Sequence, residues 1–100
     1  MKSIADIEAL IKKLAGLDTK KMYLNDFYHT WKESDDELAA VFAVAEALRG
    51  LRENNISSKC FDSGLGISVF RDNSTLTRFS FASACNLLGL EVQDLDEKKS

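Results

Sequence analysis

Residues 71–78 combine small hydroxyl side chains with arginines, in the order RDNSTLTR. They lie between an apolar segment typical of a strand and an amphipathic segment typical of a helix. The first turn of a helix leaves about four backbone N–H groups without intrahelical acceptors and carries about half a positive charge, so it attracts phosphate or carboxylate. Ser74, Thr75 and Thr77 add hydroxyl donors. This spacing predicts an anion-binding turn.

Arg78 is the informative residue of this turn, because a cation in the first turn of a helix opposes the helix dipole. A bound anion would reverse that effect, since a guanidinium offers forked donors to phosphate or carboxylate. An ordinary alternative needs no ligand. In it, Asn73 or Ser74 caps the helix, and Arg78 pairs with Asp72 or Asp94. The spacing leaves both interpretations open.

The segments around the turn predict a βαβ unit. Residues 67–70 have the β-branched and aromatic content of a short strand. Residues 79–88 form a broad apolar helical face that stops at Gly89, and residues 90–95 can form a second strand. The order strand, loop, helix, strand implies a parallel pair. Because parallel sheets normally bury both faces, two strands alone predict exposed apolar surface.

The first half of the chain predicts two helices joined by an irregular segment. Ser3 can cap the first helix, and Ser34 and Glu37 form a capping box before the second. The aromatic-rich segment between them follows neither the helical nor the strand period. An apolar stripe over 4–17 predicts a helix with Gly16 near its stop, followed by an irregular segment over 22–31 and a helix over 35–53.

The remaining residues capable of chemistry form no second motif. His29 is the only histidine and has no partner at ligand spacing, so we assign it no role. Cys60 and Cys85 lie beside apolar residues without a CxxC pattern, which favours reduced, buried thiols over a disulfide or zinc site. We therefore predict no metal and no cofactor.

Composition limits the classes of partner. The 100 residues suffice for one small domain, and 45% hydrophobic with 29% charged residues is typical of a globular chain. A net charge of −3 gives no general attraction to nucleic acid or anionic membranes, so an anion site must be built locally. With no signal-peptide core and no apolar stretch near the ~20 residues of a membrane span, we expect a cytoplasmic protein without nucleic-acid or membrane partners.

The sequence of residues 64–96, GLGISVFRDNSTLTRFSFASACNLLGLEVQDLD, resembles the carbamoyl-phosphate half of the aspartate/ornithine carbamoyltransferase family. The signature of that family is Ser-Thr-Arg-Thr-Arg after the first sheet strand. Similarity continues upstream through residues 26–27, 30–31 and 36–38. It is closest to a branch of unassigned substrate, sometimes described as knotted carbamoyltransferases. The resemblance implies an α/β fold in which N-terminal helices precede the βαβ unit of a parallel sheet.

The resemblance implies that carbamoyl phosphate binds to Ser74, Thr75, Leu76, Thr77 and Arg78. Ser74, Thr75 and Thr77 would hold the phosphate by backbone N–H and hydroxyl groups, and Thr77 would also reach the carbamoyl oxygen. Arg78 matches the second arginine of the signature, which helps organise the phosphate site, so Thr77 and Arg78 are the implied catalytic residues. Leu76 replaces the first arginine and supplies no charge; losing such a donor typically lowers the rate by ~10²–10³.

The family also implies parts that we do not find in these 100 residues: a loop from a neighbouring subunit, later histidine-containing segments and a second domain for the amine. We expect a partial carbamoyl-phosphate-binding domain over residues 1–100, mainly helical over 1–55 and strand-loop-helix-strand over 56–100. A second departure from the closest branch is Lys98, where glycine is usual; Lys99 and Ser100 then match.

We interpret the chain as the N-terminal fragment of a carbamoyltransferase-like protein. It would bind the phosphate of carbamoyl phosphate for carbamoyl transfer to an amino group of an amino-acid-like substrate. The family implies a homo-oligomer, a trimer, and we expect the chain alone to be inactive. The alternative is a non-catalytic anion-binding or subunit-assembly module, which the neutral Leu76 favours.

Overall fold

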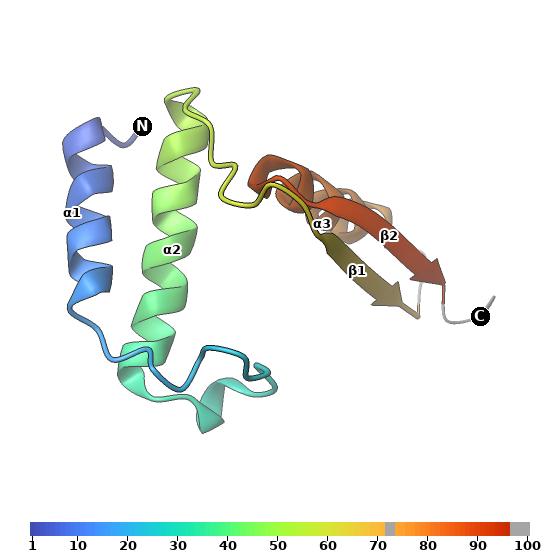
Figure 1. Cartoon of the computed structure of the whole chain (residues 1–100), viewed down its shortest axis with the longest axis horizontal. Coiled ribbons are helices and arrows are strands. Elements are labelled where there is room, and N and C mark those ends of the chain that lie inside the picture. The colour runs from blue at the N-terminus through green and yellow to red at the C-terminus, as the bar shows by residue number, and fades with distance from the viewer. Residues whose placement is uncertain (72–73, 97–100) are drawn as a thin grey trace. The chain divides into compact units, whose positions relative to one another are not determined.

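The computed structural model describes residues 1–71 and 74–96, in two compact units, Met1–Ile56 and Ser57–Ser100 (Figure 1). The first unit holds helix α1 (Ile4–Ala15), one 3₁₀ turn (Thr30–Lys32) and helix α2 (Asp35–Glu53). The second holds strand β1 (Leu65–Phe70), helix α3 (Thr75–Leu88) and strand β2 (Glu91–Asp96). The fold is therefore α/β, with N-terminal helices before a βαβ unit, as the sequence predicts.

A capping box starts each N-terminal helix. In α1, the Ser3 N–H donates to Asp6 Oδ2 at 3.0 Å, and the Asp6 N–H donates to Ser3 Oγ at 3.2 Å. In α2, the Ser34 N–H donates to Glu37 Oε1 at 2.7 Å, and the Glu37 N–H donates to Ser34 Oγ at 3.1 Å. The helix predicted over 35–53 is confirmed. The first predicted helix is also present, and its predicted stop near Gly16 is confirmed, because α1 ends at Ala15 with Gly16 as its C-cap.

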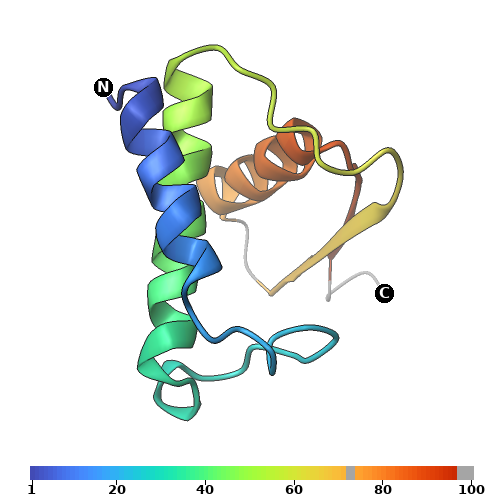
Figure 2. The same ribbon diagram turned by 60° about the vertical axis from the view of Figure 1, so that its left-hand side comes forward.

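Helices α1 and α2 lie side by side and run in opposite directions (Figure 2). Ile7 of α1 and Ala40 and Ala43 of α2 are buried, each no more than 5% exposed. The small alanine side chains let the two helices approach closely. An ion pair between Lys2 Nζ and Glu46 Oε2, at 3.0 Å, fixes the end of the pair near the N-terminus. The first unit is thus a helical hairpin.

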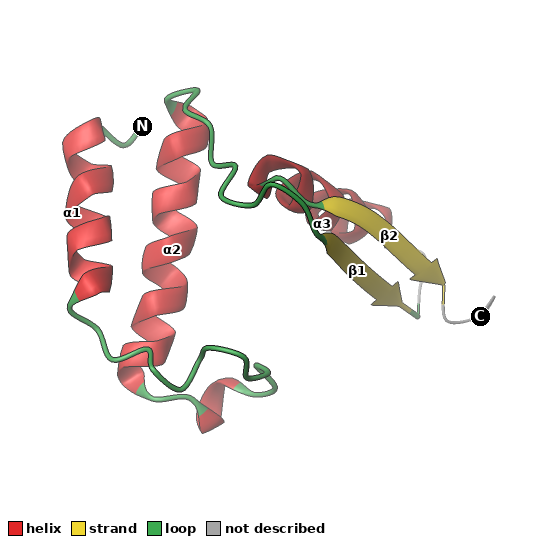
Figure 3. Cartoon of the chain, viewed as in Figure 1, coloured by secondary structure: helices red, strands yellow, loops and turns green. Residues whose placement is uncertain are grey.

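The segment between α1 and α2 is mostly loop, as the absence of a clear period predicts (Figure 3). Its one regular turn, Thr30–Lys32, includes Trp31. The ring of His29 stacks on that of Trp31, with centroids 4.3 Å apart, and both side chains are exposed. His29 therefore lies in an exposed ring contact within the loop of the first unit.

In the second unit, β1 and β2 pair in parallel, with Leu65 opposite Glu91 and Phe70 opposite Asp96. Helix α3 connects them and packs on one face of the sheet (Figures 1 and 2). The predicted stop of α3 is confirmed, because Gly89 adopts φ 98°, in the left-handed region that favours glycine. Strand β1 begins two residues earlier than the predicted range of 67–70.

The face of β1 turned away from α3 is apolar and exposed. Leu65, Ile67 and Val69 alternate along the strand and are 55%, 54% and 58% exposed. This agrees with the exposed apolar surface expected of a two-stranded parallel sheet. The prediction for the cysteines is correct in part: both are free and Cys85 is buried, but Cys60 is exposed, because it lies in the loop before β1 rather than in packed structure.

Candidate anion-binding site

The described part of the candidate turn lies where β1 ends and α3 begins. Ser74 is the N-cap residue of α3, with extended backbone, and the Arg78 N–H donates to its carbonyl at 3.1 Å. The Ser74 hydroxyl donates to Thr77 Oγ1 at 2.8 Å rather than accepting an N–H of the first turn. Thr75, Leu76 and Thr77 are exposed. The structure therefore gathers hydroxyl groups at an accessible helix start.

The sequence also offers Asp72 as an ion-pair partner of Arg78 and Asn73 as a cap of the helix. It further singles out the loop residues Lys98, Lys99 and Ser100. All five lie outside the described residues. Of the two candidate caps, the structure therefore describes only Ser74. This residue occupies the N-cap position without making the usual side-chain hydrogen bond to the first turn.

Arg78 points back onto the sheet. Its Nη1 lies 2.8 Å from Asp94 Oδ2, and its guanidinium carbon lies 5.4 Å from the centre of the Phe70 ring. Its side chain is 20% exposed, against 39% for that of Asp94. Of the partners that the sequence allowed for Arg78, the structure shows Asp94. The guanidinium therefore contacts both strands, through Phe70 of β1 and Asp94 of β2.

Leu76 occupies the signature position of the missing arginine. Its side chain is 80% exposed in the first turn of α3. An exposed leucine contributes its backbone N–H to the helix start but no charge. In this chain, the groups that could attract an anion to the turn are therefore the helix N–H groups and the hydroxyl groups, without an arginine at position 76.

Sequence reasoning missed Ser68. This residue lies opposite Asp94 in the sheet and is 6% exposed, and its hydroxyl donates to Asp94 Oδ1 at 2.9 Å. The available signal was a polar residue in the centre of each strand, in ISVF and in EVQDLD. A buried polar group normally has a hydrogen-bond partner, so a polar residue in the centre of one strand predicts a polar partner on its neighbour.

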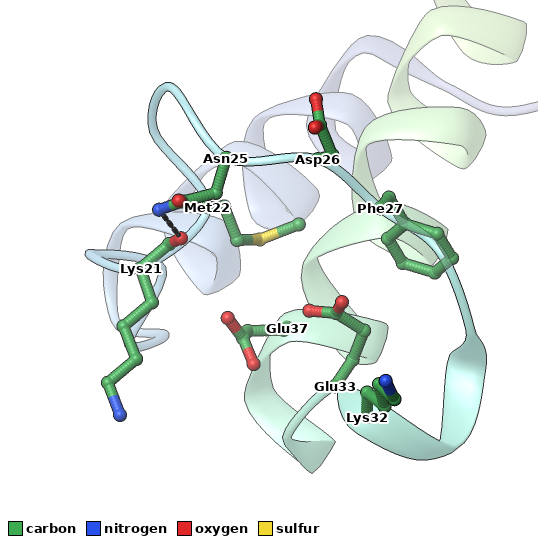
Figure 4. Close-up of a pocket in the computed structure, with 8 residues that line it drawn as sticks. All are labelled: Lys21, Met22, Asn25, Asp26, Phe27, Lys32, Glu33 and Glu37. Atoms are coloured by element: carbon green, nitrogen blue, oxygen red, sulfur yellow. Dashed lines mark hydrogen bonds between the residues drawn. The ribbon is translucent and has the colours of Figure 1, made fainter.

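The hollows that lie away from the turn, among the described residues, include one in each unit. One, of about 220 Å³ in the first unit, is lined by residues of the segment 21–27 and by Lys32, Glu33 and Glu37 (Figure 4). The other, of about 610 Å³, lies at the amino-terminal ends of β1 and β2, the sheet edge opposite the turn. Within residues 1–71 and 74–96, no group of three or more His, Cys, Asp or Glu side chains could hold a metal ion. No described helix has the length and apolar character needed to cross a bilayer.

Comparison with known proteins gives a consistent assignment. The model of the aspartate/ornithine carbamoyltransferase carbamoyl-P binding domain matches residues 25–100. A protein of Escherichia coli strain K12 named "Putative carbamoyltransferase YgeW" is 60% identical over 94 residues, which are 94% of this chain and 24% of that protein. Aspartate carbamoyltransferase 1, chloroplastic, of Pisum sativum is 33% identical over 73 residues, which are 73% of this chain and 19% of that protein. The chain spans about a quarter of the length of the first of these curated relatives and about a fifth of the second.

Proposed function

Because this chain belongs to the aspartate/ornithine carbamoyltransferase family and matches its carbamoyl-P binding domain, we propose that the first turn of α3 binds the phosphate group of carbamoyl phosphate. The observation that carries the proposal is the accessible helix start, where hydroxyl groups gather at the carboxyl end of a sheet strand. Ligands of open α/β sheets bind at that edge.

Each residue of the turn has a distinct role in this proposal. Ser74, Thr75 and Thr77 donate hydroxyl and backbone N–H hydrogen bonds to phosphate oxygens. Thr77 also reaches the carbamoyl oxygen, whereas Leu76 contributes only its N–H. Arg78 organises the turn from below, a role supported by its contacts with Asp94 and Phe70.

The complete protein then transfers the carbamoyl group to an amino group of an amino-acid-like substrate in the cytoplasm. Residues 1–100 form part of its carbamoyl-phosphate-binding domain. The amine-binding domain and further carbamoyl contacts belong to the rest of a longer chain and to a neighbouring subunit of a trimer. The length of the relatives, about four times that of this chain, supports this proposal. The 100 residues alone bind without turnover.

Calorimetric titration of carbamoyl phosphate and of inorganic phosphate tests the site, on the unmodified chain and on Leu76→Arg. Restoring the guanidinium adds a charge-assisted hydrogen bond to the anion, so affinity for both ligands should rise about tenfold or more. Leu24→Arg is the matched control, because Leu24 is 87% exposed and lies outside the turn. The same added charge there should leave affinity unchanged. Absence of binding by both the unmodified chain and Leu76→Arg would refute the proposed site.

The second candidate is a non-catalytic anion-binding or subunit-assembly module. It is favoured by the neutral Leu76 and by the exposed apolar face of β1. The complete gene product separates the two functions: carbamoyl transfer to any amino acid in a radioactive transfer assay excludes the module. Anion binding or assembly without transfer would support it.

A further inference from the structure

Three side chains from three elements form a chain of contacts under the turn. Ser68 of β1 donates to Asp94 Oδ1 at 2.9 Å, and Asp94 of β2 accepts from Arg78 Nη1 of α3 through Oδ2 at 2.8 Å. Each carboxylate oxygen of Asp94 therefore has its own partner. The guanidinium of Arg78 also lies over Phe70, the last residue of β1. The contact chain thus begins and ends on the sheet.

Two of these three residues, Ser68 and Asp94, lie in the sheet, whereas Arg78 lies in the first turn of a helix. Ser68 and Asp94 lie opposite one another in the parallel ladder, so the backbone hydrogen bonds of the sheet fix their positions. The start of α3 has no such ladder, and helix ends fray. Arg78 lies in this first turn, and its N–H makes the hydrogen bond to the Ser74 carbonyl. An anchor on Arg78 therefore restrains the turn that carries the hydroxyl groups.

We propose that Asp94, held by Ser68, is a positioning residue of the phosphate site: it fixes the Arg78 guanidinium against the sheet and so sets the first turn of α3. The proposal rests on the function proposed above for that turn. Asp94 does not contact the ligand in this scheme; it acts through Arg78. Preorganised donors bind an anion more tightly than mobile ones because less ordering accompanies binding.

Ser68→Ala is the decisive variant because it removes the hydroxyl that holds Asp94 and changes no charge. An Asp94→Asn change would also remove a negative charge near the anion, and the two effects would oppose each other. Ser83→Ala is the matched control, since Ser83 is an exposed serine within α3 and outside the first turn. Both variants are made in the full 100-residue chain.

Amide hydrogen exchange followed by NMR tests the positioning without any ligand. In Ser68→Ala, the amide of Arg78 should exchange about tenfold faster, while the Leu90 amide, bonded to the Cys85 carbonyl, keeps its rate. Ser83→Ala should leave both rates unchanged. An unchanged Arg78 amide, or equal acceleration at both ends of α3, would overturn the inference, since the latter indicates general destabilisation.

Affinity for carbamoyl phosphate then tests the route through Arg78. Ser68→Ala should weaken binding about three- to tenfold, the range expected for one hydrogen bond. The same substitution in an Arg78→Ala chain should have no further effect. A loss of equal size in both backgrounds contradicts the route. If the unmodified chain binds neither carbamoyl phosphate nor inorganic phosphate, the proposed function has failed, and the exchange rates still decide whether Ser68 and Asp94 hold the turn.

Discussion

At the scale of single residues, the first turn of α3 contains one exposed apolar side chain, Leu76, and one side chain held by the sheet, Arg78. Leu76 is exposed and uncharged where the family signature has arginine. Arg78 is mostly covered and pairs with Asp94. A helix-start cation normally opposes the dipole, but here a carboxylate from β2 compensates it. The proposed anion binding by hydroxyl and N–H groups of the turn is therefore compatible with the ion pair between Arg78 and Asp94.

Truncating Arg78 tests its contribution to the fold. Arg78→Ala removes both the contact with Asp94 and the stacking on Phe70, so we expect the free energy of unfolding in urea to fall by about 1–2 kcal/mol. The lower end is favoured because the Asp94 carboxylate is more than one third exposed to solvent. Arg52→Ala, at an exposed position near the end of α2, serves as control and should cost less. If Arg78→Ala changes neither stability nor anion binding, the turn is an ordinary helix start.

At the scale of elements, local sequence explains where the N-terminal helices begin. The Ser34 N–H, and then the Ser34 hydroxyl, hold the pKa of Glu37 below its ordinary value of 4.5. The same arrangement, with Ser3, lowers the pKa of Asp6 in α1. A capping carboxylate in the first turn also interacts favourably with the helix dipole. The stability of the N-terminal turns of α1 and α2 should therefore depend on pH.

The sign of that dependence follows from the lowered pKa of Glu37. Its contribution to stability is complete above its ordinary value of 4.5 and is lost as the pH falls through the lower, folded-state value. Glu37→Gln keeps an acceptor for the Ser34 N–H but cannot titrate. Its urea unfolding free energy should therefore fall less steeply than that of the unmodified chain between about pH 5 and pH 3. Glu8→Gln, at an exposed position of α1, is the control. Equal slopes for Glu37→Gln and the unmodified chain would exclude this contribution.

At the scale of the whole molecule, the described part of the second unit exposes one apolar face of its sheet. Parallel sheets normally bury both faces, yet Leu65, Ile67 and Val69 are each more than half exposed. Contiguous exposed apolar surface promotes association. The relatives have about four times the length of this chain. This exposed face is therefore available for contact with another polypeptide surface.

This exposed face predicts self-association of the 100-residue chain. Sedimentation velocity should show the average mass rising with concentration, and Ile67→Lys should suppress that rise by placing a charge at the centre of the face. Tyr23→Lys, at a position 78% exposed in the first unit, is the control and should still associate. Circular dichroism checks that both variants keep their helices. A chain that stays monomeric at all concentrations would contradict the prediction.

The sequence by itself determined the features that arise from neighbouring residues. Ser34 and Glu37 satisfy N-terminal groups of the helix that they start, so the start of α2 followed from neighbouring residues. Gly89 ended α3 for an equally local reason, its positive φ. The signature from Ser74 to Arg78 likewise located the candidate site, because its residues are consecutive and share one helix start.

Only the tertiary structure decided which residues distant in sequence meet. Ser68 and Asp94 are 26 positions apart, and their hydrogen bond depends on the parallel register of β1 and β2. That register depends on how the apolar residues of both strands and of α3 pack together, so the residues of one strand alone do not determine it. The choice of Asp94 as partner of Arg78 and the exposure of Cys60 were decided in the same way. Contacts across elements depend on the assembled fold, whereas caps and turns depend on adjacent residues.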